Sequence, residues 1–64
     1  MKILSTDTIE MHDHAGVVQL QMHLCNDYGR LAYLVSYPSE IKGYQREKIF
    51  YEIERAHNFI DNLQ

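Results

Sequence analysis

The sequence predicts an α+β fold: a small antiparallel sheet of two or three strands, with one C-terminal helix packed on one face. Apolar residues alternate with polar ones from Val18 to Tyr37, which is the period of a strand that buries one face. From Ile49 to Leu63 they return every third or fourth position, which is the period of an amphipathic helix. Pro38 and Gly43 separate the two patterns, since proline cannot donate to a sheet ladder and glycine interrupts regular structure.

An N-terminal edge strand is predicted from Lys2 to Met11. The alternation in this segment is imperfect, because Ile3, Ile9 and Met11 share one parity while Leu4 falls on the other. Threonines within the segment favour a strand, since β-branched side chains fit a pleated surface. We therefore expect a third strand beside the hairpin that follows it.

A β-hairpin is predicted over residues 17–37. Its first strand places apolar side chains on one face and Gln19, Gln21 and His23 on the other. Its second strand runs from Leu31 to Tyr37 and ends at Pro38. The apolar positions of the two strands are Val18, Leu20, Met22 and Leu24, followed by Leu31, Tyr33, Val35 and Tyr37.

The turn of this hairpin leaves two registers open. A four-residue loop, Asn26 to Gly29, pairs Leu24 with Leu31 and gathers the large apolar side chains onto one face. A three-residue loop, Asp27 to Gly29, pairs Leu24 with Ala32 and makes both faces partly apolar. Because a slip of one residue moves a whole set of side chains to the other face, burial favours the four-residue loop.

The C-terminal helix is predicted over residues 44–62. Charged and polar side chains such as Glu54, Arg55 and Asn58 occupy the face opposite its apolar stripe. The stripe has the spacing of a heptad seam, which would also suit pairing between helices of two copies. Fewer than three heptads are present, so we expect the helix to cover its own sheet first. The stripe consists of Ile49, Ile53, Ala56, Ile60 and Leu63.

Length and cysteine content predict one marginally stable domain over residues 1–64. A chain of 64 residues buries only about 60% of its unfolded surface, so a small core needs support from a disulfide, a metal or a second copy. Cys25 is the only cysteine, which excludes an internal disulfide. The free thiol and the lack of a signal-like apolar run predict a cytoplasmic protein without a membrane span.

Few residues suggest chemistry. His12, Asp13 and His14 have metal-ligand side chains, but their spacing is weakly specific and favours a polar turn between two strands, so we predict neither a metal nor another cofactor. Cys25 and His23 lack an orienting group, so they do not predict a thiol nucleophile. The sequence predicts no catalytic residue and no enzyme activity.

Aromatic residues are the candidate partner-binding positions: Tyr33, Tyr37, Tyr51, Phe50 and Phe59. Aromatic side chains are enriched at protein interfaces, and a small domain with open sheet edges favours association. We therefore predict a small non-catalytic protein-binding module, a homodimer that serves as an accessory, regulatory or inhibitor protein.

A nucleic-acid-binding regulator is the alternative function. In that case Tyr33 and Tyr37 would stack on bases while arginines and lysines contact phosphates. Six Lys and Arg against nine Asp and Glu give a net charge of -3, which weakens the expectation of nucleic-acid binding. The sequence therefore favours a protein partner.

Overall fold

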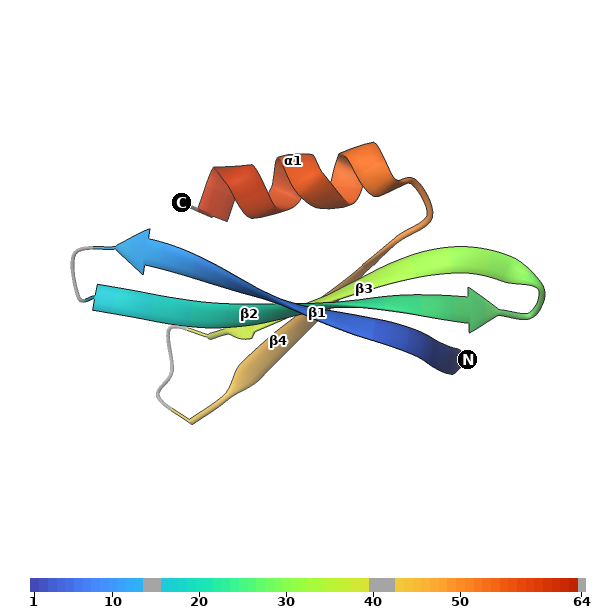
Figure 1. The fold of residues 1–64 in the computed structure, drawn as a ribbon, viewed down its shortest axis with the longest axis horizontal. Helices are drawn as coiled ribbons and strands as arrows, with labels where there is room; N and C mark the ends of the chain where they lie inside the picture. Colours follow the sequence, from blue (N-terminus) through green and yellow to red (C-terminus); the bar gives the residue numbers. More distant parts are fainter. Residues whose placement is uncertain (14–15, 40–42, 64) are drawn as a thin grey trace.

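The computed structural model describes residues 1–13, 16–39 and 43–63. Four strands form one antiparallel sheet in the order β1-β2-β3-β4, and a single helix follows them (Figure 1). The predicted α+β class is therefore confirmed, with one strand more than expected. The elements are β1 (Lys2–Asp13), β2 (Gly16–Asp27), β3 (Arg30–Pro38), β4 (Gln45–Phe50) and α1 (Ile53–Leu63).

β1 is the predicted N-terminal edge strand, and a bulge explains its imperfect alternation. Ile3 pairs with Cys25 whereas Ser5 pairs with Leu24, so one residue, Leu4, is inserted between them. A bulge changes the parity of the side chains that follow it. Ile9 and Met11 consequently reach the face under the helix, while Ile3 pairs on the opposite face.

The turn between β2 and β3 is shorter than either predicted loop. Asp27 pairs with Arg30, so only Tyr28 and Gly29 connect the strands, and Leu24 pairs with Tyr33. Tyr28 and Gly29 have φ angles of 51° and 85°, the two positive values of a type I′ turn. The four-residue loop and its pairing of Leu24 with Leu31 were therefore wrong, although the observed register still places the large apolar side chains of both strands on one face.

The predicted helix over residues 44–62 was wrong in its first part, because Gln45–Phe50 is strand β4. This segment pairs with β3 from Pro38 to Tyr33, and the amide of Ser39 donates to the carbonyl oxygen of Tyr44 at 2.9 Å across the connection. Without β4, β3 would be an open edge with unpaired backbone groups. Sheet pairing therefore overrides the local helical pattern here.

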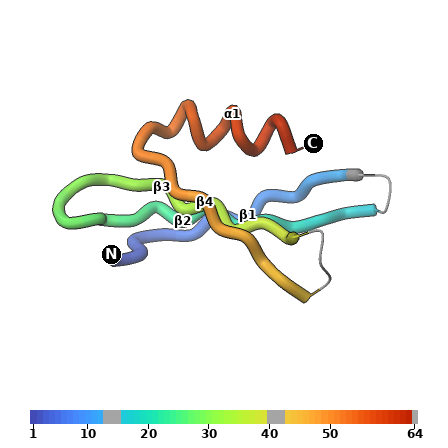
Figure 2. The backbone as a smooth tube through the Cα atoms, turned by 180° about the vertical axis from the view of Figure 1, so that it is seen from behind, coloured from blue at the N-terminus to red at the C-terminus, as the bar shows by residue number. Residues whose placement is uncertain are grey.

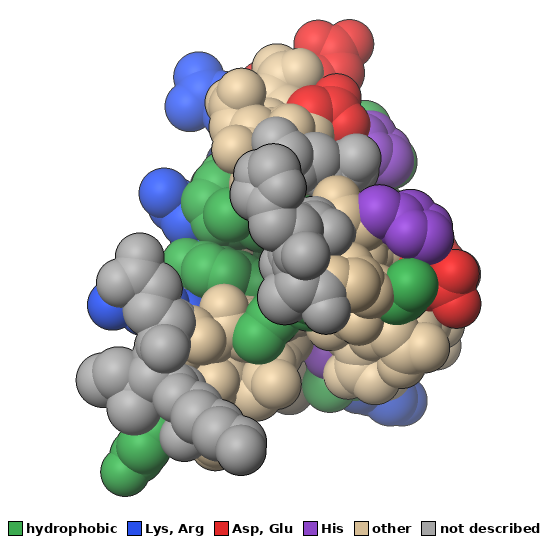
Figure 3. All heavy atoms as spheres, turned by 90° about the vertical axis from the view of Figure 1, so that its left-hand side faces the viewer, with side chains coloured by type: hydrophobic (Ala, Val, Ile, Leu, Met, Phe, Trp, Pro, Cys, Tyr) green, Lys and Arg blue, Asp and Glu red, His purple; other side chains and the backbone are tan. Residues whose placement is uncertain are grey.

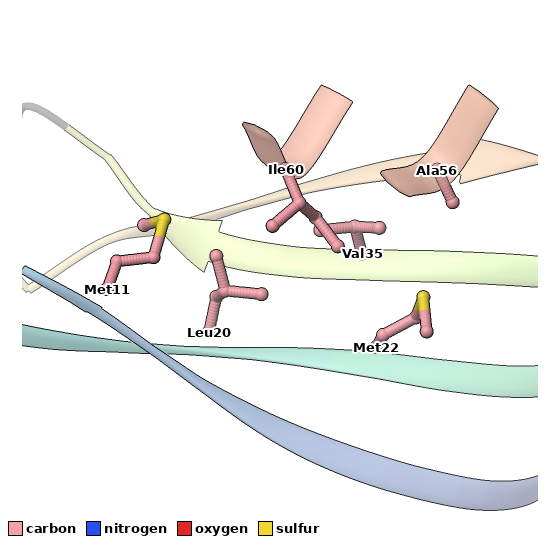
Figure 4. Close-up of a cluster of buried hydrophobic side chains, with 6 residues drawn as sticks. All are labelled: Met11, Leu20, Met22, Val35, Ala56 and Ile60. Atoms are coloured by element: carbon pink, nitrogen blue, oxygen red, sulfur yellow. The ribbon is translucent and has the colours of Figure 1, made fainter. Parts of the chain in front are cut away.

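The helix α1 lies across the middle of one sheet face and touches it through few residues (Figures 1 and 2). Ala56 and Ile60 are its buried side chains, whereas Ile53 and Leu63 of the predicted stripe are 45% and 37% exposed. Figure 4 shows Leu20 and Met22 pointing toward this helix from the sheet. The buried cluster consists of Met11, Leu20, Met22, Val35, Ala56 and Ile60.

Candidate interaction site

An aromatic cluster packs between the helix and the last two strands. Phe59 is its centre, with ring centroids 5.2 Å from Tyr37 and 5.3 Å from Phe50. The Lys48 ammonium lies 5.1 Å from the Phe59 ring centroid, a distance at which a cation is attracted to the ring. All three rings are half-buried against the core. The cluster therefore joins the helix to the sheet.

Tyr51 lies on the opposite face of the sheet, away from the other predicted aromatic positions. Its hydroxyl donates to Asp27 Oδ2 at 2.8 Å, and the Arg30 guanidinium carbon lies 4.1 Å from its ring centroid. This hydrogen bond to Asp27 raises the pKa of Tyr51 above its ordinary value of 10.0. Tyr51 follows β4 and precedes α1, so its predicted position within the helix over residues 44–62 was wrong. Through its hydrogen bond to Asp27, Tyr51 connects the segment after β4 to the residue next to the β2–β3 turn.

The five predicted partner-binding aromatics therefore divide into two groups. Four of them, Tyr33, Tyr37, Phe50 and Phe59, are half-buried and pack against the hydrophobic core on the helix side. Tyr51 is 39% exposed on the other side. No single surface brings all five together. Sequence reasoning missed the contacts of Asp27 and Arg30 with Tyr51, because residues about 24 positions apart carry no local signal.

The charged side chains are distributed unevenly between the two sides of the molecule. Seen from the end that carries the connection between β1 and β2, most of the visible Lys and Arg lie on one side and the His side chains on the other, where some basic side chains also lie (Figure 3). On the β4 edge the exposed Arg46 and Lys48 outnumber Glu47, and on the β1 edge the exposed Asp7 and Glu10 outnumber Lys2. Each edge therefore carries both signs, with basic residues in excess on β4 and acidic residues in excess on β1.

Described residues line several shallow hollows on the surface, and three of them bear on the site. One of about 260 Å³ on the open sheet face is lined mainly by uncharged polar side chains, including Gln19, Gln21 and Ser36. A second, of about 290 Å³, lies between β3 and the helix beside Tyr37 and Leu63. The third, of about 240 Å³, includes Tyr51 and two arginines. None of these sets combines a nucleophile with a base, so they do not specify a reaction.

The histidines and the cysteine are placed apart from one another. His12 is exposed, and His14 lies outside the described residues. Among the described residues, no three His, Cys, Asp or Glu side chains are grouped closely enough to hold a metal ion. Cys25 is fully buried, and its thiol donates to the carbonyl oxygen of His23 at 3.6 Å. His23 in turn shares a 2.7 Å hydrogen bond with Thr6 Oγ1.

Helices formed by the described residues lack the length and apolar character that crossing a membrane requires. No protein-family model, curated protein or solved structure matches the chain.

Proposed function

We propose that the protein is a small non-catalytic protein-binding module that works as a homodimer and acts as an accessory, regulatory or inhibitor protein. The observation that carries the proposal is the amount of surface that a single copy leaves in water. A chain of 7.6 kDa exposes 5013 Å². A compact monomer of this mass exposes about 4,300 Å².

The excess surface is of the size that association uses. It amounts to about 700 Å², and a standard protein interface buries about 800 Å² on each partner. The elongated shape accounts for the excess, since the principal extents are 39 × 23 × 16 Å. The radius of gyration is 12.1 Å, against about 11 Å for a compact chain of this length. A second copy that covers this surface would also support a core of only a few buried side chains.

Measuring the mass in solution tests the proposal. Light scattering coupled to gel filtration, repeated over a wide range of concentrations, should give twice the chain mass of 7.6 kDa at the higher concentrations. Dilution should shift the mass toward that of one chain, because association follows mass action. A mass of one chain at every concentration would refute the homodimer.

Nucleic-acid binding remains the alternative, and the placement of the tyrosines gives it little support. Tyr33 and Tyr37 are half-buried on the helix side, so their ring faces do not form an open stacking platform. The basic residues that would contact phosphates are Arg30, Lys42, Arg46 and Lys48, of which Lys42 lies outside the described residues. Filter binding at low salt, followed by a salt titration, tests this alternative, since phosphate contacts weaken steeply as salt is added.

We also propose that the protein is located in the cytoplasm. The supporting feature is Cys25, which is reduced and buried. A lone thiol is compatible with a reducing compartment. Fractionation of cells that express the tagged chain would test this assignment, with recovery in the soluble cytoplasmic fraction as the expected result.

A further inference from the structure

The end of the sheet that carries the β2–β3 turn concentrates exposed hydrophobic side chains. Eight large hydrophobic residues among those described are at least 45% exposed, and six of the eight lie at this end. The other two, Val17 and Tyr44, lie toward the opposite end. We call the six residues the apolar end: Met1, Ile3, Leu4, Tyr28, Leu31 and Ile53.

Strand pairing brings these residues together. Ile3 pairs with Cys25, which pairs with Ala32, the residue that follows Leu31. In the neighbouring row of the ladder, Lys2, Asn26 and Leu31 lie side by side. Ile53 begins the helix above the same end, where the chain leaves β4 (Figure 1). Adjacent rows point to opposite faces, so Ile3 lies on the open face and Leu31 on the helix side, and the exposed apolar side chains surround this end of the sheet on both faces.

The helix is too short to cover this surface. Eleven residues make a helix about 16 Å long, whereas the molecule is 39 Å long. Figures 1 and 2 show the β2–β3 turn and the N-terminus projecting beyond the first turn of α1. The apolar end consequently has no cover from the described part of its own chain.

We propose that the apolar end is the surface through which two copies of this chain associate. The inference rests on the proposed homodimer and assigns it a location. The excess surface of the whole chain, about 700 Å² per copy, is close to what one partner contributes to a standard interface. Contiguous exposed apolar patches of several hundred Å² mark interaction sites.

Charges around the apolar end favour a second copy as the occupant. Both signs are present: Lys2 and Arg30 are basic, and Asp27 and Glu52 are acidic. A partner of one sign, such as a nucleic acid or an anionic lipid surface, would meet repulsion from half of this rim. A second copy, related by a two-fold axis, presents the same mixture and can match each charge with an opposite one.

The geometry of a two-fold dimer adds a further contact. Met1, Ile3 and Leu4 lie on or beside β1, an edge strand with one strand neighbour in the described sheet. Apposition of two apolar ends therefore brings two open strand edges near each other, where backbone groups can pair. The apolar side chains form the centre of this interface and the charged residues form its rim.

Two lysine substitutions test the assignment, with a third as a matched control. Leu31→Lys and Ile3→Lys each place a charge at the apolar end, at side chains that are both 53% exposed. Val17→Lys places the same charge on β2 at the opposite end of the sheet, at a side chain that is 56% exposed. All three positions are open to water, so the folded chain accommodates the lysines, which circular dichroism would check.

Sedimentation of the full chain over a concentration series gives the outcome. Each substitution at the apolar end should raise the dimer dissociation constant about tenfold or more, because every dimer carries two copies of the change. Val17→Lys should match the wild type. A dimeric wild type that all three variants leave unchanged, or that only Val17→Lys weakens, would refute this location and leave the homodimer standing. A monomeric wild type would refute both the homodimer and its location at the apolar end.

Discussion

Both ends of the sheet project beyond the helix, but they expose different numbers of apolar side chains (Figure 1). At the end with the β1–β2 connection, Val17 and Tyr44 are the described large apolar residues that are at least 45% exposed. The apolar end has six such side chains. Lack of cover by the helix is common to both ends, so it does not explain the difference. This difference supports the proposal that the hydrophobic residues of the apolar end serve association and not the core of one copy.

The largest expected contrast is between two isoleucines of the same helix. Ile60 is 4% exposed in the core, whereas Ile53 at the apolar end is 45% exposed. Ile60→Ala should lower the free energy of unfolding by about 2 to 5 kcal/mol, because it removes buried methyl groups and leaves a cavity. Ile53→Ala should cost less than about 1 kcal/mol in a dilute sample.

Urea unfolding at low protein concentration measures both changes. Repeating it at high concentration should increase the effect of Ile53→Ala, since that residue then contributes to association. Equal losses for the two variants in dilute solution would mean that the apolar end is part of the core of a single copy.

A substitution in the β2–β3 turn separates folding from association. Tyr28 is 96% exposed and has a φ of 51°, a conformation that asparagine adopts more readily than tyrosine. Tyr28→Asn should raise the free energy of unfolding of one copy by about 0.5 kcal/mol. The same change removes an aromatic side chain from the apolar end and should weaken the dimer.

Gly29→Ala is the control for this turn. Gly29 has a φ of 85°, and an added Cβ would meet nothing within 4 Å. Its expected cost of about 1 to 2 kcal/mol is therefore conformational. If Tyr28→Asn destabilised the fold as much as Gly29→Ala, the type I′ turn would be wrong.

The smallest expected effect is at Tyr51, and it depends on pH. The hydrogen bond to Asp27 raises the pKa of Tyr51, so the folded chain favours the protonated phenol. Its contribution is complete below the ordinary tyrosine pKa of 10.0 and is lost as the pH rises through the higher pKa of the folded chain. Tyrosinate absorbance should show one late-titrating tyrosine that Tyr51→Phe removes and Asp27→Asn shifts to lower pH. An unchanged titration in Asp27→Asn would show that the hydrogen bond does not form in solution.

Local patterns sufficed to predict much of the fold. Val18 to Leu24 alternates cleanly because one of its faces lies under the helix, and Pro38 ends its strand because it cannot donate to the ladder. Ala56 and Ile60 share a helical face and are buried as expected. In each case the periodicity of a few neighbouring residues reflects burial directly.

The remaining features depend on residues that are distant in sequence. Gln45–Phe50 has a helical pattern of its own, but the open edge of β3 recruits it as a strand. The short turn needs a positive φ at Tyr28, and a tyrosine in the sequence does not predict that conformation. Helical spacing also placed Ile53 in the core, whereas the loss of the first helical turns to β4 leaves it at the apolar end. The apolar end was missed for the same reason, since only the ladder brings Ile3 of β1 and Leu31 of β3 to the same end of the sheet.

Hydrogen exchange followed by mass spectrometry at two protein concentrations tests the central claim most directly. We predict that raising the concentration slows exchange in residues 1–4 and 27–31 and around the start of α1. Residues 16–19 should exchange at the same rate in both samples, because the opposite end stays in water. Slower exchange confined to residues 16–19, or no dependence on concentration anywhere, would contradict the assignment of the apolar end as the association surface.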